Sequence, residues 1–452
     1  MTKSLGSDFT KGPIFKNLLL FTVPFFLSNL LQILYNVIDM IVVGQAAGQI
    51  GLSAVSIGGD ITNCLTTVII GFSTAGQVII SQYLGAGERQ RIGPFIGTMS
   101  VFILVCALAF SAVCLILRDS LLVWMSTPKE GWREARDYVT VCLLGLIFLC
   151  GYNTVSAVLR GMGDGRHPLL FAVIASGINV ALDLVFVIRF SWGAAGAAAA
   201  TVIAQAVSFL LAVAFLRSRR EQLGFVIRTC DFTIDREFAL LLVKIGVPMA
   251  LKSAAVQITK LFVDSFINSY GVVVCAACGV TNRISSIINL LSQAFNTSGS
   301  AMISQNIGGE RYERVTQILA RMFAVTIPMT AAACLALVCW PEEIFRLFTG
   351  EGEVIAVCMT YVPIGVAAFL SSAVRSPMNA LIYGCGNYKI NFVTAVLDGM
   401  ILRVGLSLFF GLSAGMGYRG FWLGDAIAGY TPCVIGLVLF VSGKWKTNRY
   451  II

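Results

Sequence analysis

The sequence predicts an all-α integral membrane protein with twelve transmembrane helices in two pseudo-symmetric six-helix bundles. Of its 452 residues, 57% are hydrophobic and only 12% are charged, against roughly 25% charged residues in a soluble domain. Apolar stretches of about 20 residues recur from end to end, each long enough to cross a hydrocarbon core of roughly 30 Å. Motifs of the first half return in the second. The alternating pattern of a membrane β-barrel is absent, so the spans are helical.

The apolar stretches define the elements in chain order. The first six spans are expected at about residues 16–43, 52–82, 94–117, 134–159, 168–190 and 194–216. The second six are expected at about residues 237–269, 273–305, 317–340, 354–382, 389–411 and 419–442. The longest polar connection, residues 217–236, separates an N-lobe of residues 1–216 from a C-lobe of residues 237–452.

Three pairs of motifs relate the two halves. FTVPFF at 21–26 aligns with IGVPMA at 245–250, which places Pro24 opposite Pro248. ISQYLGAGER matches ISQNIGGER, and LRGMGD matches IYGCGN. Six spans in each half give both halves the same orientation, as in parallel repeats about an axis along the membrane normal. Such an arrangement is expected to enclose a cavity and to rock between two access states.

Basic residues predict the orientation. They gather in alternate connections, for example at Arg89, Arg160 and Arg311, and an excess of basic residues marks cytoplasmic loops. Both termini are therefore expected in the cytoplasm, and the N-terminus shows no cleavable signal peptide. The same bias accounts for the net charge of +9, so nucleic-acid binding is not predicted.

The 13 cysteines are scattered through apolar stretches, where cysteine acts as a small hydrophobe. Cys275 and Cys278 form a CxxC motif, but no second pair or nearby histidine completes a metal site. We therefore expect small residues at a helix contact, and neither a metal centre nor a cofactor.

An acid lies within the first apolar stretch. Asp39 follows a long apolar run that contains Pro24. A charge at the centre of a membrane helix costs on the order of 2.5–3.5 kcal/mol, so membrane segments carry one with a partner or a task. Proline removes a backbone donor and kinks a helix, and Pro24 and Pro248 are both expected to do so. This pattern indicates a cation site on a kinked helix.

Several motifs resemble a known family. They are LYNVIDMIVVG, ISQYLGAGER, LRGMGDGRHP, NVALDLVFV, GAAGAAAATVIAQ and ILRVGLSLFF. In this order they resemble the multidrug and toxic compound extrusion (MATE) transporters of the MOP superfamily, and within them the bacterial DNA-damage-inducible (DinF-like) branch. The similarity covers nearly the whole chain. It implies two six-helix lobes in a bacterial cell membrane and export of organic compounds in exchange for protons or sodium ions.

The resemblance also implies a cation site in the N-lobe. It places this site on Asp39, Asn179, Asp183 and Thr201, with Asn153 as a further candidate. Asn179 and Asp183 are four residues apart, so they share one helix face. Two carboxyl groups in a dry pocket do not both ionise unless a cation stands between them, so the site holds one proton or one small cation.

The oxygens of Asn179 and Thr201 suit either a hard ion or a protonated acid, so the sequence leaves H+ and Na+ open as the coupling ion. The structural alternative is that Asp183 bonds within its lobe and Asp39 pairs with a buried amide. The sodium-coupled branch of the family carries an acid after the proline of the seventh helix and another in the tenth. Here KSAAVQITK and SSAVRSPMN contain neither, which favours the N-lobe site.

The C-lobe spans carry basic residues. Lys260 and Asp264 are spaced to neutralise each other, and Arg403 is a candidate clamp to a helix end. Lys252, Arg283 and Arg375 lack a sequence-local partner, so we expect them to line the cavity and favour substrates with a carboxylate or phosphate. The alternative is that they extend to the membrane interface. Further candidates for lining the cavity are Gln32, Tyr35, Asn36, Lys260, Gln257 and Met378.

The resemblance, together with the intramembrane acids, implies a secondary active exporter of small organic or amphiphilic compounds that works by H+ or Na+ antiport. One chain carries both lobes, so a monomer in the lipid bilayer is sufficient. The alternative is a flippase of the same superfamily for lipids or lipid-linked precursors, favoured by the basic cavity. An enzyme is not predicted, because the single histidine, His167, lies in a loop and no HExxH motif is present. No filter-like loop indicates a channel.

Overall fold

The computed structural model describes residues 6–125, 127–219 and 224–447, which form helices with no strand in these ranges. Residues 220–223 of the predicted polar linker lie outside the described residues. The longer helices are α1 (Ile14–Ala86), α2 (Arg89–Ile116), α4 (Trp132–Gly161), α5 (Arg166–Asp183), α6 (Gly193–Ser218), α7 (Arg236–Asn268), α8 (Val272–Gly308), α9 (Tyr312–Cys339), α12 (Val362–Gly384), α15 (Tyr418–Ala428) and α16 (Thr431–Ser442).

Shorter segments complete the chain. They are α3 (Arg118–Trp124), α10 (Pro341–Arg346), α11 (Gly352–Met359), α13 (Tyr388–Val396), α14 (Leu402–Leu408) and α17 (Lys444–Thr447). The 3₁₀ turns are η1 (Lys129–Gly131) and η4 (Thr229–Asp231), and the π-helical segments are η2 (Leu184–Arg189), η5 (Leu397–Ile401) and η6 (Phe409–Ser413).

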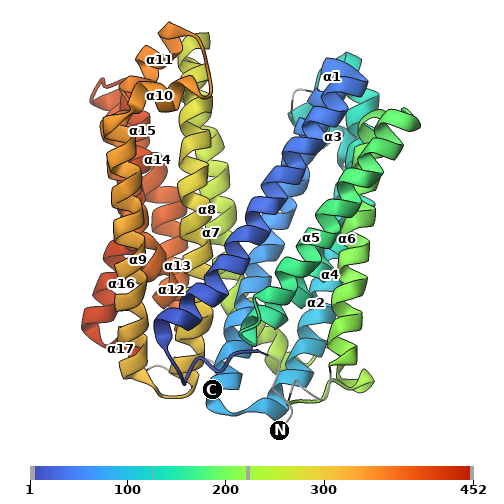
Figure 1. The fold of residues 1–452 in the computed structure, drawn as a ribbon, viewed down its shortest axis with the longest axis vertical. Coiled ribbons are helices and arrows are strands. Elements are labelled where there is room, and N and C mark those ends of the chain that lie inside the picture. Colours follow the sequence, from blue (N-terminus) through green and yellow to red (C-terminus); the bar gives the residue numbers. More distant parts are fainter. Residues whose placement is uncertain (1–5, 126, 220–223, 448–452) are drawn as a thin grey trace. The chain divides into compact units, whose positions relative to one another are not determined.

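Helix α1 contains the first two predicted spans. Its 73 residues would reach about 110 Å at 1.5 Å per residue, far more than a bilayer. The helix is broken at Gly48, where φ is 64° and ψ is −155°, a conformation that glycine adopts without a steric penalty. The chain reverses there, so α1 has two arms (Figure 1).

The described residues contain ten helices long and apolar enough to cross a membrane, and α11 and α12 add a pair bent by 54°. Counting the bent pair as one span and each arm of α1 separately gives the predicted twelve. The all-helical membrane fold is thereby confirmed.

The chain folds as two compact units. The N-unit contains Val23–Gly246 and the residues up to Asp8, and the C-unit contains Phe9–Thr22 and Val247–Ile452. These units differ from the lobes expected from the polar linker. The start of α1 belongs to the C-unit, and the start of α7 belongs to the N-unit. The two changes of unit inside α1 and α7 fall directly ahead of a repeat proline, Pro24 or Pro248.

The second ISQ motif anchors the segment before α1 within the C-unit. The Phe9 amide donates to Gln305 Oε1 at 2.9 Å, and Asn306 Nδ2 donates to the Phe9 carbonyl at 3.1 Å. Leu18 and Phe21 of α1 are buried in the same apolar cluster. Backbone bonding and apolar burial therefore both hold this segment to the C-unit.

The N-unit holds the segment before α7 in a related way. Thr98 Oγ1 donates to the Thr233 carbonyl at 3.0 Å and accepts from the Asp235 amide at 3.3 Å. The Phe238 ring makes edge contacts with Tyr83 and Phe95, at centroid distances of 6.5 and 5.9 Å. The repeat seen in sequence thus extends to the way each unit receives a segment from the other half.

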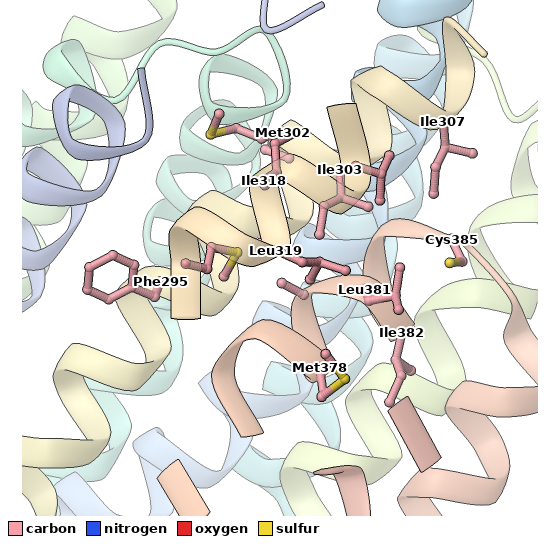
Figure 2. Packing of buried hydrophobic residues seen from close by; sticks show 14 of the residues in the cluster. Phe295, Met302, Ile303, Ile307, Ile318, Leu319, Met378, Leu381, Ile382 and Cys385 are labelled. Carbon is pink, nitrogen blue, oxygen red and sulfur yellow. The ribbon is translucent and has the colours of Figure 1, made fainter. Parts of the chain in front are cut away.

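A close-packed apolar cluster holds three helices of the C-unit together. Figure 2 shows Ile303 of α8, Leu319 of α9 and Leu381 of α12 directed toward one another. These side chains are at most 3% exposed. Apolar burial at close packing stabilises such a cluster, and it forms a rigid frame for the polar residues on the same helices.

Helix α15 packs against η6 without room for a side chain at Gly420. A Cβ atom there would lie 2.3 Å from the Phe410 carbonyl oxygen. We expect Gly420→Ala to lower the free energy of unfolding by about 1–3 kcal/mol, the usual cost of overpacking. Thermal unfolding in detergent, followed by tryptophan fluorescence, measures this effect. Gly405→Ala is the matched control, because no heavy atom lies within 4 Å of its Cβ position. Equal unfolding temperatures for the two variants would contradict the prediction.

Candidate functional site

The N-unit buries the predicted acidic pair. Asp39 of α1 is 6% exposed, and Asn179 and Asp183 of α5 are 1% and 0% exposed. Asn179 Nδ2 donates to Thr201 Oγ1, and Thr201 Oγ1 donates to Asp39 Oδ2, both at 3.3 Å. The structure therefore brings three helices together at the residues expected to form the cation site.

The carboxyl group of Asp183 lies beside that of Asp39. In the described part of the chain, no donor contacts either oxygen of Asp183, Asp39 Oδ1 or Asn179 Oδ1. The ion pairs among these residues include neither acid. Two ionised carboxylates buried without a partner are strongly disfavoured, so this arrangement requires a proton or a cation between them.

Four buried acceptor oxygens of these three residues thus have no hydrogen-bond donor among the described residues. Oxygen ligands from carboxylates and amides suit a hard cation such as Na+, and a shared proton would satisfy the two carboxyl groups equally well. Asp183 is the last residue of α5 before the π-helical η2. The wider π turn changes the direction of the following side chains, and such turns are frequent at functional sites.

Three other predicted residues of the N-unit, Gln32, Tyr35 and Asn36, lie on α1 with Asp39. Tyr35 lies close to Asp39 and to Gln205 of α6. Gln205 is 6% exposed and its Oε1 has no donor among the described residues. The sequence-based site omitted it, although it closes the GAAGAAAATVIAQ run and is polar within an apolar span. Gln32 is half-buried and Asn36 is exposed.

Asn153 does not join the acidic pair through any hydrogen bond in the described structure. Its Nδ2 donates to the Leu149 carbonyl one turn earlier on α4, at 2.9 Å. This bond uses the amide donor within its own helix.

Both predicted kink residues lie inside helices, Pro24 in α1 and Pro248 in α7. Ser28 Oγ donates to the Pro24 carbonyl at 2.9 Å. A serine bonded one turn back in this way tends to bend a helix, which adds to the effect of the missing proline donor.

A cavity of about 430 Å³ lies within the C-unit. Its charged lining residues are Lys252, Lys260, Arg375, Arg403, Asp264, Asp398 and Asp425, and Gln257 also lines it. Lys252, Lys260, Gln257 and Arg375 were expected at a cavity.

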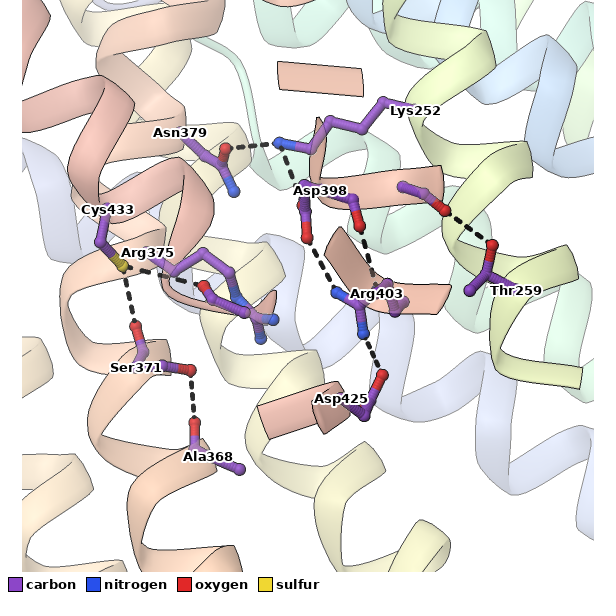
Figure 3. Close-up of polar contacts among 12 residues, drawn as sticks. Lys252, Thr259, Ala368, Ser371, Arg375, Asn379, Asp398, Arg403, Asp425 and Cys433 are labelled. Atoms are coloured by element: carbon purple, nitrogen blue, oxygen red, sulfur yellow. Dashed lines mark hydrogen bonds and ion pairs between the residues drawn. The ribbon is translucent and has the colours of Figure 1, made fainter. Parts of the chain in front are cut away.

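Arg403 is the centre of a buried ion network in this cavity (Figure 3). Its Nη2 contacts Asp398 Oδ1 at 2.9 Å and its Nη1 pairs with Asp425. Its Nε also donates to the Asp398 carbonyl at 3.4 Å, as expected of a clamp. Lys252 Nζ donates to Asn379 Oδ1 at 2.7 Å and lies 4.0 Å from Asp398 Oδ2.

Two residues expected at a cavity do not line this one. Arg283 is exposed on α8, because its neighbours Thr281 and Asn282 occupy the helix face that lines the cavity. Met378 is 3% exposed, belongs to the apolar cluster of the three helices and lines a separate pocket of about 340 Å³, whereas Asn379 next to it faces the cavity.

Lys260 and Asp264 do not form the ion pair that their spacing suggested. Both line the cavity, but no ion pair within 4.0 Å joins these two described residues. Asp264 instead accepts a hydrogen bond from Asn282 Nδ2 at 3.2 Å and a contact from the Cys278 thiol at 3.4 Å. A spacing of four residues on a helix allows an ion pair but does not require one, because a neighbouring helix can supply competing hydrogen-bond donors.

Known proteins share this sequence pattern and this fold. The MatE family model matches residues 24–185 and 248–416. The chain is 28% identical over 446 residues to "Probable multidrug resistance protein YpnP" of Bacillus subtilis, with 98% of each chain covered. A solved structure described as the "outward-facing conformation of a multidrug resistance MATE family transporter of the MOP superfamily" aligns with a TM-score of 0.89 at 20% identity, over 99% of this chain and 100% of that one.

A second solved structure, described as "MATE in the bent conformation", aligns with a TM-score of 0.87 at 21% identity, over 98% of this chain and 97% of that one. At these identities the two structures show the shared fold. The expected resemblance is thereby confirmed at the level of the family and its fold.

Proposed function

Because the chain belongs to the MatE family of membrane transporters, we propose that it is a secondary active multidrug exporter that moves small organic or amphiphilic compounds out of the cell in exchange for H+ or Na+. Two similar proteins of Bacillus subtilis are described as probable multidrug resistance proteins. The proposal places the chain in a bacterial cell membrane with both termini in the cytoplasm, acting as a monomer.

The observation that carries the proposal is the buried pair of Asp39 and Asp183. Their carboxyl groups lie side by side with three orphaned oxygens and no basic partner among the described residues. Such a pair binds one cation and releases it when the pocket becomes accessible to the other side. An intramembrane acid of this kind is typical of ion pathways and proton relays.

The position at which α1 passes from one unit to the other suggests how cation binding is coupled to a conformational change. Asp39 lies in the first arm of α1, after Pro24, and the change of unit falls directly ahead of that proline. A proline kink concentrates bending at one turn of a helix. We infer that cation uptake at Asp39 and Asp183 bends α1 at Pro24, and that this bending drives the change of access from one side of the membrane to the other.

The flippase alternative is favoured by one observation, the basic residues that line the C-unit cavity. Lipid-linked precursors carry phosphate groups, which such residues bind. Proteoliposomes separate the two functions: export of amphiphilic dyes without movement of a lipid-linked sugar supports the exporter, and the reverse supports the flippase.

The test of the proposed function is dye efflux from proteoliposomes under a pH gradient and a sodium gradient imposed separately. We expect efflux above the rate of empty liposomes under at least one gradient, because the acidic pair exchanges its cation only when an inward gradient drives it. Ionophores that collapse that gradient should return efflux to background. Equal rates with and without both gradients would overturn ion coupling.

A further inference from the structure

Helix α6 of the N-unit and α15 of the C-unit can be aligned residue by residue from the structure. Gly193 is the first residue of α6 and Gly417 directly precedes α15. Both have positive φ, 56° and 61°, and they are 224 residues apart (417 − 193). Gly196 packs on the backbone of Phe186 and Gly420 on that of Phe410, and both pairs keep the same offset. Closely packed glycines fix the register of two helices, so this offset also relates the polar residues nearby.

By this offset, a basic residue of the C-unit is equivalent in the alignment to a residue of the N-unit cation site. Asn179 corresponds to Arg403, and Thr201 corresponds to Asp425. Where the N-unit has a hydrogen bond between Asn179 and Thr201, the C-unit has an ion pair between Arg403 and Asp425. The guanidinium group of Arg403 is thus a permanent cation at the position equivalent to Asn179. In the N-unit, the acids near Asn179 have no such cation among the described residues.

Arg403 forms ion pairs with two carboxylates, those of Asp398 and Asp425. Asp398 approaches Lys252 only to 4.0 Å. Arg403, Lys252 and Arg375 carry three positive charges against the two negative charges of these acids, so one positive charge is in excess. The two sites therefore differ in charge: the N-unit site has acids without bases among the described residues, and the C-unit cavity has one more base than acids.

Arg375 has only neutral partners. Its Nη2 donates to Asn289 Oδ1 at 2.7 Å and to Ser372 Oγ at 3.2 Å, and it forms no ion pair with a carboxylate in the described ranges. A guanidinium carries five N–H donors in a planar fork that fits a carboxylate. An uncompensated cation within a membrane protein is unfavourable unless a ligand or a water-filled cavity receives it.

Four aromatic side chains lie in the wall of the cavity that contains Arg375. Phe369, Tyr361, Tyr383 and Trp422 line it together with the basic residues, and Lys252 Nζ lies 5.3 Å from the centre of the Tyr383 ring. Pockets that combine aromatic walls with a few convergent polar groups bind small organic molecules. The volume of about 430 Å³ accommodates a small ring system.

We propose that the C-unit cavity binds small aromatic acids, with Arg375 contacting the carboxylate directly and Lys252 as a second donor. The inference names a substrate class for the proposed exporter and rests on that function for its role in transport. Binding itself requires neither a gradient nor the acidic pair of the N-unit.

The experiment measures equilibrium binding of 2-naphthoate and its neutral amide, 2-naphthamide, to the full chain in phosphatidylcholine nanodiscs by calorimetry. The two probes share a ring and differ in charge. We expect the unaltered protein to bind naphthoate at least about tenfold more tightly, because the carboxylate forms charge-assisted hydrogen bonds. Equal affinities, or no naphthoate binding at millimolar concentration, would overturn the site without requiring any variant.

Variants then locate the binding site. Arg375→Gln should weaken naphthoate binding about tenfold or more and leave naphthamide binding unchanged. Arg283→Gln is the matched control, because it removes the same charge from an exposed position outside the cavity. A loss with Arg283→Gln as large as that with Arg375→Gln would assign the effect to overall charge and overturn the proposal.

A final variant separates this proposal from the proposed function. Asp39→Asn should abolish gradient-driven efflux and leave naphthoate affinity unchanged, since the acid lies in the other unit. Naphthoate binding that is lost with Asp39→Asn would contradict a site in the C-unit. Efflux that persists in this variant would contradict the ion coupling alone.

Discussion

Asp39→Asn is expected to reduce gradient-driven export to the level of empty liposomes while the protein still folds. Asparagine preserves the size and one acceptor oxygen of the side chain, so Thr201 retains its hydrogen-bond acceptor. A neutral amide neither releases a proton nor balances a cation, and it removes the repulsion that makes the pair with Asp183 bind one. Loss of transport therefore comes from ion coupling and not from packing. The measurement is dye efflux from proteoliposomes under the gradient that drives the unaltered protein.

Asp60→Asn is the matched control for this experiment. Asp60 is an acid in the second arm of the same helix, exposed in the structure and outside the ion pairs of the described residues. We expect this variant to export at the unaltered rate, and both variants to elute as single species in size-exclusion chromatography. Export by Asp39→Asn at the rate of Asp60→Asn would refute the role of the acidic pair.

Arg403→Met is expected to destabilise the C-unit more than any other single charge removal discussed above. Methionine approximates the length of arginine but leaves Asp398 and Asp425 near each other without their shared cation. Removing one partner of a buried ion network typically costs about 3–5 kcal/mol. The partial exposure of Asp425, whose side chain is 36% accessible, places the expected loss toward the lower end of that range. Chemical unfolding in detergent, followed by tryptophan fluorescence, measures the change.

Two further variants distinguish charge loss from a general effect of substitution. Arg283→Met makes the same replacement at an exposed position of α8 and should change the free energy of unfolding by less than about 0.5 kcal/mol, as is usual for surface substitutions. Arg403→Lys retains a positive charge and should recover part of the stability, although it loses the bidentate geometry of arginine. If Arg403→Met and Arg283→Met unfold at the same denaturant concentration, the network does not stabilise the C-unit.

Much of the fold could be predicted from the sequence because its cause is local. A run of about 20 apolar residues has few alternatives to a membrane helix, and the twelve predicted spans correspond to the helices found. The paired prolines and repeated motifs likewise predicted two related halves. Asp39 was notable in sequence for an equally local reason, since an acid in an apolar span is costly.

The positions of side chains around each helix could not be predicted in the same way. The sequence-based expectation grouped Arg283 with Lys252 and Arg375, because all three are basic residues in apolar spans without a local partner. In the structure only Lys252 and Arg375 face the cavity. The π-helical segments η5 and η6 flank Arg403 and alter the helical period there, so its pairing with Asp425 does not follow from spacing.

The sequence by itself determined that this chain is a helical membrane protein built from two repeats, with an acid on its first helix, because hydrophobicity and repetition are properties of the residues alone. Only the tertiary structure decided which acids meet each other, which meet a base, and where the chain changes unit. Those outcomes depend on how helices distant in sequence pack, since packing sets the distance between opposite charges and thereby decides whether a buried carboxyl group needs a proton or a cation from outside.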